Sequence, residues 1–306
     1  MKRQRFLTAF ILIAILIPLI SVPQLLGIFE VVMVLFVVFA SRELLLMFEQ
    51  KEKLTPIFKS LTIILTVSIY ISIAGFLGFN QRAPFNPTFL MAIIPLIVAF
   101  LLIYFVLSSR FKVEHIGSAL LVMVYIGFGG ASIAVLRFLG VRYIIYMALV
   151  STLTDTFAYI IGMRFGKRQL APSISPKKSW EGSIGGTIFA TVIASGFALF
   201  YGRLFPESTQ IGYFFNWDGL DTIFDTIISS DMPMYVLTII VILLTLTASI
   251  ISQFGDLFAS KLKRHYEIKD FGHIFPGHGG IMDRFDSIIM VALYMSSIIY
   301  VLTLIL

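Results

Sequence analysis

Long apolar runs alternate with short polar segments along this 306-residue chain. A helix needs about 20 apolar residues to cross a hydrocarbon core. Nine runs are long enough: residues 6–22, 29–48, 60–79, 88–107, 117–136, 141–163, 184–203, 234–258 and 282–306. The pattern therefore predicts an all-α polytopic membrane protein with nine transmembrane helices.

Composition supports this prediction, because 58% of the residues are hydrophobic and only 13% are charged, which is about half the charged share of a soluble domain. The first run follows three basic residues but has no small-residue cleavage site, so we expect a retained helix. We expect residues 1–306 to form one membrane domain, with N-terminal helices in 1–140 and the candidate chemistry in 141–306. Cysteine is absent, which excludes disulfides and thiolate metal sites.

Lys and Arg are unequally divided between the two sets of predicted loops. Seventeen lie at the N-terminus and near 49–59, 108–116, 164–183 and 259–281, against four on the other side. The positive-inside rule then places the N-terminus in the cytoplasm and the C-terminus outside. The longest outer loop, 204–233, contains four aromatic residues in its 213–217 stretch, which we expect at the membrane interface.

Ionisable residues inside apolar runs are costly, so each needs a partner or a wet cavity. Arg42 and Glu43 are adjacent near a helix end, and we expect them to pair or to reach the interface. Asp155 lies about 12 Å inside the sixth span at 1.5 Å per residue. Its side chain is too short to reach water from there, which makes it a candidate functional residue.

Three further aspartates mark the last two spans. Asp256 ends the eighth span and shares a helix face with Ser260, whereas Asp283 and Asp286 begin the ninth. A helical hairpin would bring these carboxylates together, and clustered carboxylates repel one another unless a cation lies between them. Mg²⁺ takes one or two carboxylates together with water and phosphate oxygens. The aspartates therefore predict a magnesium site.

The loop at 164–183 carries two basic pairs, Lys167 with Arg168 and Lys177 with Lys178. Such a run is either a topology signal or a contact for phosphate groups. The order Ser-Pro-Lys-Lys-Ser-Trp-Glu-Gly in residues 175–182 is unusually specific and favours a substrate role. Glycines at 185 and 186 would permit close backbone approach at the start of the seventh span.

The loop at 259–281 adds more cations and then a His-Gly-Gly turn before the ninth span. Glycines can turn several N–H groups toward one anion, and a helix N-terminus adds a favourable dipole. His278 could bond a phosphate or transfer a proton. Together with the aspartates, this loop predicts a phosphate-bearing substrate and a divalent cation.

These motifs resemble those of the integral-membrane phosphatidate cytidylyltransferases, also called CDP-diacylglycerol synthases. The resemblance covers roughly residues 150–290, including Asp155, Tyr159 and the segment from Gly166 to Gly186. Ala259 departs from the family pattern, where a Glu often stands. The C-terminal signature matches at Ser260, Leu262, Lys263, Arg264, Lys269, Asp270, Gly272, Pro276, His278, Gly279, Gly280, Asp283, Arg284 and Asp286.

The resemblance implies that CTP and phosphatidic acid yield CDP-diacylglycerol and pyrophosphate at the cytoplasmic face of the cell (inner) membrane. It also implies Mg²⁺ dependence, with room for a second cation, and a homodimer. The expected catalytic residues are Asp256, Asp283, Asp286, Lys269 and His278. The expected substrate-binding residues are Lys167, Ser175, Lys177, Lys178, Ser260, Lys263, Arg264, Gly279, Gly280 and Arg284. Asp256 and Asp283 are the expected metal ligands, with Asp155 a further candidate.

Two alternatives stay open at this point. One is another CTP-dependent membrane lipid phosphotransferase, such as a lipid kinase, which would leave CDP instead of pyrophosphate. The other is an anionic-lipid or ion transporter. Transport would place essential charges through both leaflets, whereas the outer halves of these spans are almost free of charge.

Overall fold

A computed structural model describes residues 14–78, 95, 98–99, 102–107, 112–216, 219–227, 232–275 and 279–305, and it is mostly helical. The chain forms two compact units. The first comprises residues 1–138 and 262–289, and the second comprises residues 139–261 and 290–306.

Seven helices in the described part are long and apolar enough to cross a membrane. They are α2 (Leu26–Phe48), α3 (Pro56–Gly78), a continuous helix from α5 (Val113–Val122) through η2 (Met123–Phe128) to α6 (Gly129–Leu139), α7 (Val141–Phe165), α8 (Trp180–Leu199), α11 (Met234–His265) and α12 (Met282–Ile305). All seven correspond to predicted spans, which confirms a polytopic helical protein. Of the predicted span 6–22 the structure describes residues 14–22, of which 14–21 are helical, and of the span 88–107 it describes residues 95, 98–99 and 102–107.

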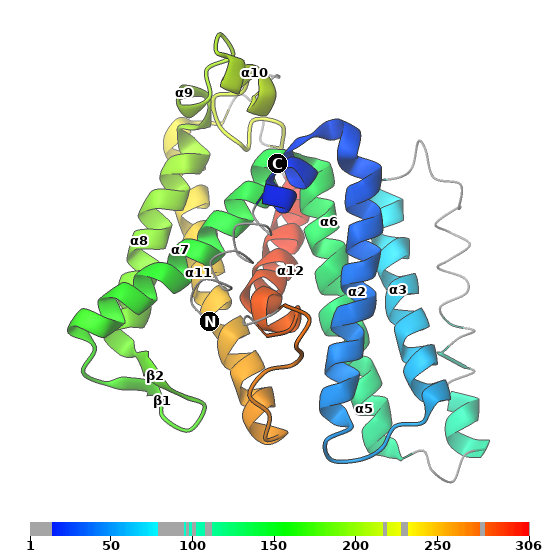
Figure 1. Ribbon diagram of the computed structural model, residues 1–306. Coiled ribbons are helices and arrows are strands. Elements are labelled where there is room, and N and C mark those ends of the chain that lie inside the picture. The colour runs from blue at the N-terminus through cyan, green and yellow to red at the C-terminus, as the bar shows by residue number, and fades with distance from the viewer. Residues whose placement is uncertain are drawn as a thin grey trace. The chain divides into compact units, whose positions relative to one another are not determined.

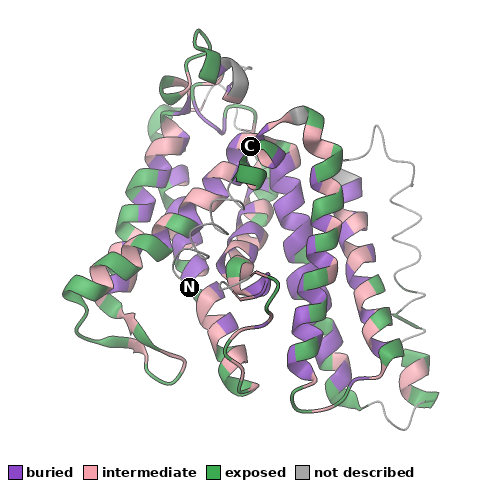
Figure 2. Cartoon of the chain, viewed as in Figure 1, coloured by how far each residue is buried: buried purple, intermediate pink, exposed green. Residues whose placement is uncertain are grey.

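In the first unit, α2 packs against α3, and α3 packs against η2 (Figure 1). A short 3₁₀ helix, η1 (Pro23–Leu25), leads into α2. Val37 and Leu44 of α2 are fully buried, whereas Ile28, Val31 and Leu35 are exposed. The exposed positions recur every three or four residues and so form one helix face. An apolar helix that buries only one face suits a lipid environment, and Figure 2 shows both buried and exposed positions along α2.

In the second unit, α7 and α8 pack along one another. Gly182 and Gly186 of α8 make this possible, because a Cβ atom at either glycine would lie within 2.7 Å of a carbonyl oxygen of α7. Small residues four apart allow such close packing in membranes, so the predicted approach at the start of this helix is confirmed. Hydroxyl pairs join α7 to α11, such as Thr154 and Ser249 with oxygens 2.7 Å apart.

Two local features differ from the sequence prediction. The loop before α8 contains an antiparallel hairpin of β1 (Gln169–Ala171) and β2 (Ser175–Ser179). The all-α prediction missed it because these short polar strands lack an alternating apolar pattern. In addition, α11 continues to His265, seven residues past its predicted end. The prediction followed the apolar run, whereas the helix extends through the polar residues that come after it. Two short helices, α9 (Tyr201–Leu204) and α10 (Gln210–Phe215), follow α8.

The beginning of α12 is held by an acid from α2. The buried Glu43 accepts hydrogen bonds from the backbone N–H groups of Ile281 (3.0 Å) and Met282 (2.9 Å). A Cβ atom at Gly272 or Gly280 would lie within 2.5 Å of this carboxylate, so both glycines make room for it. The expected pairing of Glu43 with Arg42 is therefore wrong. Arg42 is exposed. Glu43 instead binds two backbone N–H groups at the start of α12, where the first N–H groups of a helix have no partner within the helix.

We expect Glu43→Gln to destabilise the protein by about 2–3 kcal/mol, because one charge-assisted acceptor is lost at a buried helix start. Thermal unfolding in detergent measures the effect. Glu49→Gln is the matched control, since Glu49 forms a part-exposed ion pair with Lys59 at 2.8 Å, worth at most about 1 kcal/mol. Equal losses in the two variants would contradict the assigned role of Glu43.

Candidate active site

In the first unit, the loop between α11 and α12 folds around Asp283. One carboxylate oxygen, Oδ1, lies 2.9 Å from Nζ of Lys263. The other, Oδ2, accepts from the backbone N–H groups of Phe271 (2.8 Å) and Gly280 (3.0 Å). The Asp283 side chain is only 6% exposed. It therefore ties the end of α11 to both sides of the glycine-rich turn.

The glycines of this turn have specific geometric roles. Gly279 has φ of +86°, a conformation that suits glycine, and its carbonyl accepts from Phe275 N–H at 3.0 Å. Gly280 donates its N–H to Asp283, although we predicted that it binds substrate phosphate. The predicted anion-binding position at the start of α12 is likewise occupied by a side chain of the protein itself, the carboxylate of Glu43.

Three predicted cationic residues of this region lie at the surface. Arg264, Lys269 and Arg284 are exposed, so their charges face outward from the folded unit. His278 lies outside the described residues. Asp286 is half-buried near the start of α12, and its carbonyl accepts from the hydroxyl of Tyr125 at 3.0 Å. Tyr125 belongs to the π-helical segment η2, a feature that often marks functional sites.

In the second unit, the hairpin and α11 form a second cation–carboxylate pair. Nζ of Lys178, near the end of β2, contacts Oδ2 of Asp256, and the side chains are 25% and 30% exposed. Ser260, one turn further along α11, donates to Oδ1 of Asp256 at 3.3 Å. Sequence analysis predicted the shared face of Asp256 and Ser260, and this bond confirms it. Asp256 thus contacts both Ser260 and Lys178, a predicted phosphate ligand.

The unusual order of residues 175–182 is explained by how the hairpin enters α8. Ser179 is the N-cap of α8 and accepts from Gly182 N–H at 3.1 Å. Glu181 accepts from the backbone N–H groups of Lys167 (3.0 Å) and Arg168 (3.3 Å). These bonds fix the base of the hairpin while the side chains of Lys167 and Lys177 stay exposed and available to anions. Ser175, at the start of β2, is half-buried.

The carboxylates differ in how readily they could hold a metal ion. Among the described residues, no three His, Cys, Asp or Glu side chains gather closely enough to form a metal site. Asp256 already accepts a cation and is partly exposed, so its oxygens fit a hard divalent ion. Asp283 would have to release Lys263 first. Asp155 is exposed on α7, and a metal role for any of these acids stays a prediction.

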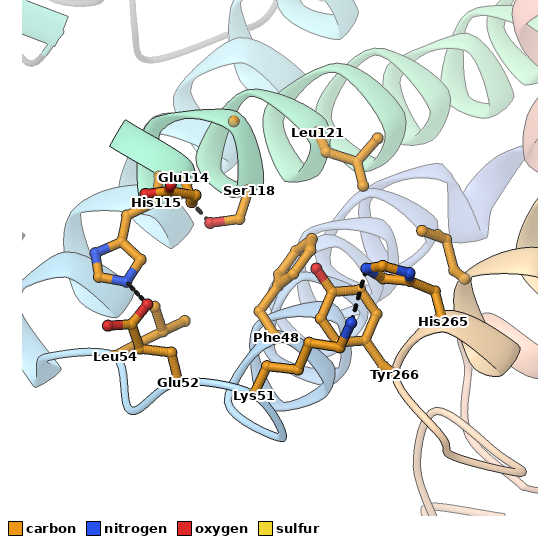
Figure 3. Close-up of a pocket in the computed structure, with 12 residues that line it drawn as sticks. Phe48, Lys51, Glu52, Leu54, Glu114, His115, Ser118, Leu121, His265 and Tyr266 are labelled. Atoms are coloured by element: carbon orange, nitrogen blue, oxygen red, sulfur yellow. Dashed lines mark hydrogen bonds and ion pairs between the residues drawn. The ribbon is translucent and has the colours of Figure 1, made fainter. Parts of the chain in front are cut away.

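A cavity of about 490 Å³ lies in the first unit, lined by residues of the α2–α3 loop, α5 and the end of α11 (Figure 3). Lys51 lies 2.9 Å from Nε2 of His265 there. On the opposite wall, an ion pair with Lys112 at 2.7 Å lowers the pKa of Glu52 below its usual value. Glu114 also lines this cavity. Since acids balance its bases, the cavity lacks the net positive charge that phosphates favour.

Sequence reasoning missed two residues that shape these sites, Glu43 and Tyr125. Glu43 did carry a signal, because an acid within an apolar span needs a partner. Its partner is backbone 238 residues away along the chain, which no local pattern reveals. Tyr125 gave no signal, since a tyrosine within an apolar span is ordinary.

Comparison with known proteins finds relatives that match part of the chain and a family that matches nearly all of it. The phosphatidate cytidylyltransferase of Bacillus subtilis is 38% identical over 198 residues, which cover 63% of this chain and 62% of that protein. That of Staphylococcus haemolyticus is 37% identical over 192 residues, which cover 62% of each. The matched region thus spans less than two thirds of these relatives. Residues 3–302 match the Cytidylyltransferase family, and this chain belongs to that family.

Proposed function

We propose that this protein transfers CMP from CTP to phosphatidic acid and releases CDP-diacylglycerol and pyrophosphate. Family membership and the names of its relatives support this activity. The observation that carries the proposal is the pairing of lysines with aspartates. Each of the two segments that resemble the family contributes a lysine to one such pair, Lys178 with Asp256 and Lys263 with Asp283.

In the proposed reaction, a phosphate oxygen of the lipid attacks the α-phosphorus of CTP. The bond from that phosphorus to the bridging oxygen breaks, and pyrophosphate leaves with the bonding electrons. A phosphate monoester is largely ionised at neutral pH, because its second pKa is about 6. The reaction therefore needs no strong general base, and His278 is a secondary candidate for proton transfer.

The protein's main tasks are then to position two anions and to neutralise their charge. Exposed Lys167 and Lys177 suit the phosphates of an incoming substrate, and Lys178 can exchange its carboxylate partner for a phosphate. In the other unit, Arg264, Lys269 and Arg284 offer three more exposed cations.

Mg²⁺ is the proposed cofactor, and Asp256 and Asp283 are its proposed ligands, with Asp286 or Asp155 in support and a second cation allowed. When bound, it would neutralise the phosphates of CTP and stabilise the leaving pyrophosphate. Asp256 fits this role because it is reachable and already binds a cationic group. The homodimer implied by the family resemblance is also part of the proposal.

We place the hairpin and the loop before α12 in the cytoplasm, where CTP is available, and the N-terminus on the same side. The unequal distribution of Lys and Arg supports this orientation in the cell membrane. The loop with α9 and α10 would then lie outside.

Purified protein incubated with CTP, phosphatidic acid and Mg²⁺ should form CDP-diacylglycerol and pyrophosphate in equal amounts. Chromatography of the lipid fraction and a pyrophosphate assay measure both products. Chelation with EDTA should abolish turnover, and added Mg²⁺ should restore it. Formation of CDP together with a doubly phosphorylated lipid would instead identify a kinase.

Asp283→Asn should lower turnover on the order of 100-fold or more, as removal of a group that stabilises developing charge does. Glu267→Gln, an exposed acid in the same loop, is the control and should leave turnover unchanged. Thermal unfolding checks that each variant folds. Since Asp283 also organises the loop, Asp256→Asn gives a second measurement at a more exposed position. Normal turnover in both Asn variants would refute the metal role.

Orientation can be tested directly because the chain lacks cysteine. Ser173→Cys in the hairpin and Glu207→Cys after α9 each introduce one exposed thiol. A membrane-impermeant maleimide applied to intact cells should label only the Glu207→Cys protein. Permeabilised cells should show labelling of both. The reverse pattern would place the hairpin outside and contradict the proposal.

A further inference from the structure

A groove of about 540 Å³ runs between α8 and α11 in the second unit. Its walls include Trp180, Ile184 and Ile188 of α8, and Ile250 and Phe254 of α11, all of them exposed. On α11 the lining extends from Leu246 to Leu257, which is about 16 Å at 1.5 Å per residue. The groove therefore follows the helices into the apolar layer.

One end of the groove adjoins the cationic hairpin. Leu170 of β1 lines it, as does Trp180, which lies two residues after Lys178. On the opposite wall, Leu257 follows Asp256, the partner of Lys178. Tryptophan favours the boundary between headgroups and hydrocarbon, so Trp180 indicates that this end of the groove lies at the membrane surface.

The floor of the groove is polar near its hairpin end. Gln253, only 7% exposed, donates to the carbonyl of Ser183 (3.2 Å) and to the hydroxyl of Thr187 (2.8 Å), and it accepts from the Ser183 hydroxyl. Both amide hydrogens of Gln253 are thus used within the protein. The groove beyond offers apolar side chains, which suits hydrocarbon more than a polar ligand.

Lys178 lies beside one end of the groove, hydroxyl and amide groups stand among the apolar side chains near that end, and the other end is lined by isoleucine and leucine alone. An anionic lipid has the same order: phosphate, ester groups, then methylene chain. We propose that this groove holds an acyl chain of the lipid substrate, with the lipid phosphate at the Lys178 end. The inference rests on the proposed function and adds to it the place of the lipid tail and a means of selecting its length.

A second copy of this chain would match the groove less well. A helix from a partner would set its own apolar face against the whole length of the groove and gain nothing from the charge at one end. The lysine at that end complements an anionic headgroup, and this charge complementarity favours the lipid.

The test compares two tryptophan variants on one face of α8. Ile188 lines the groove and is 55% exposed, whereas Val192, one turn further on, is 67% exposed and is not among the lining residues. We expect Ile188→Trp to lower kcat/KM for dioleoyl phosphatidic acid about tenfold, the effect of losing roughly two buried methylene groups. Its kcat/KM for dihexanoyl phosphatidic acid should be unchanged, because short chains end before the block. Val192→Trp should resemble the parent protein with both lipids.

Several outcomes would overturn the groove proposal. These are equal kinetics of the two variants, an equal loss with long and short lipids, or a changed oligomeric state of Ile188→Trp on size-exclusion chromatography, which would identify a second copy as the occupant. Activity of the parent protein with either lipid tests the proposed function separately.

A readout that needs no turnover is cross-linking by phosphatidic acid with a diazirine at the chain end. Cross-links should map to α8 and α11, and sites elsewhere would contradict the proposal.

Discussion

The contact between Glu43 and the first amides of α12 organises the loop on which the candidate chemistry depends. A carboxylate buried in an apolar helix is costly unless strong donors meet it, and here two backbone N–H groups do so. Two glycines make room for it, and Asp283 then binds the opposite side of the same turn. The glycine-rich motif is thus a device for fitting two internal carboxylates closely around one helix start.

In the second unit, hydrogen bonds and an ion pair likewise hold the candidate residues in place, here at a hairpin and not at a glycine-rich turn. Its hairpin is too short to be stable alone, and backbone bonds to Glu181 with the cap at Ser179 hold its base against α8. The ion pair of Lys178 with Asp256 then links the hairpin to α11. In both units, hydrogen bonds and an ion pair fix the local structure, and exposed cationic side chains lie nearby. This arrangement suits a reaction between two anions.

Much of this could be predicted from the sequence, and the limits have physical causes. Apolar runs located seven of the described helices because the membrane imposes a minimum length on each span. Helical spacing paired Asp256 with Ser260, since both lie within one turn. The hairpin was missed because its short strands pair through backbone groups and carry no alternating apolar pattern. The contact of Glu43 was missed because it joins residues 238 positions apart, and local periodicity carries no information at that range.

The lysine–aspartate pairs have a consequence for biogenesis. Asp256 and Asp283, the proposed magnesium ligands, each have a counter-charge within their own unit, so neither unit must tolerate these acids uncompensated while it assembles in the bilayer. Insertion and folding can therefore proceed before the ion arrives, unlike in zinc fingers, whose folding waits for the metal. If magnesium is the cofactor as proposed, a cell short of it would accumulate folded but inactive protein that becomes active once the ion returns.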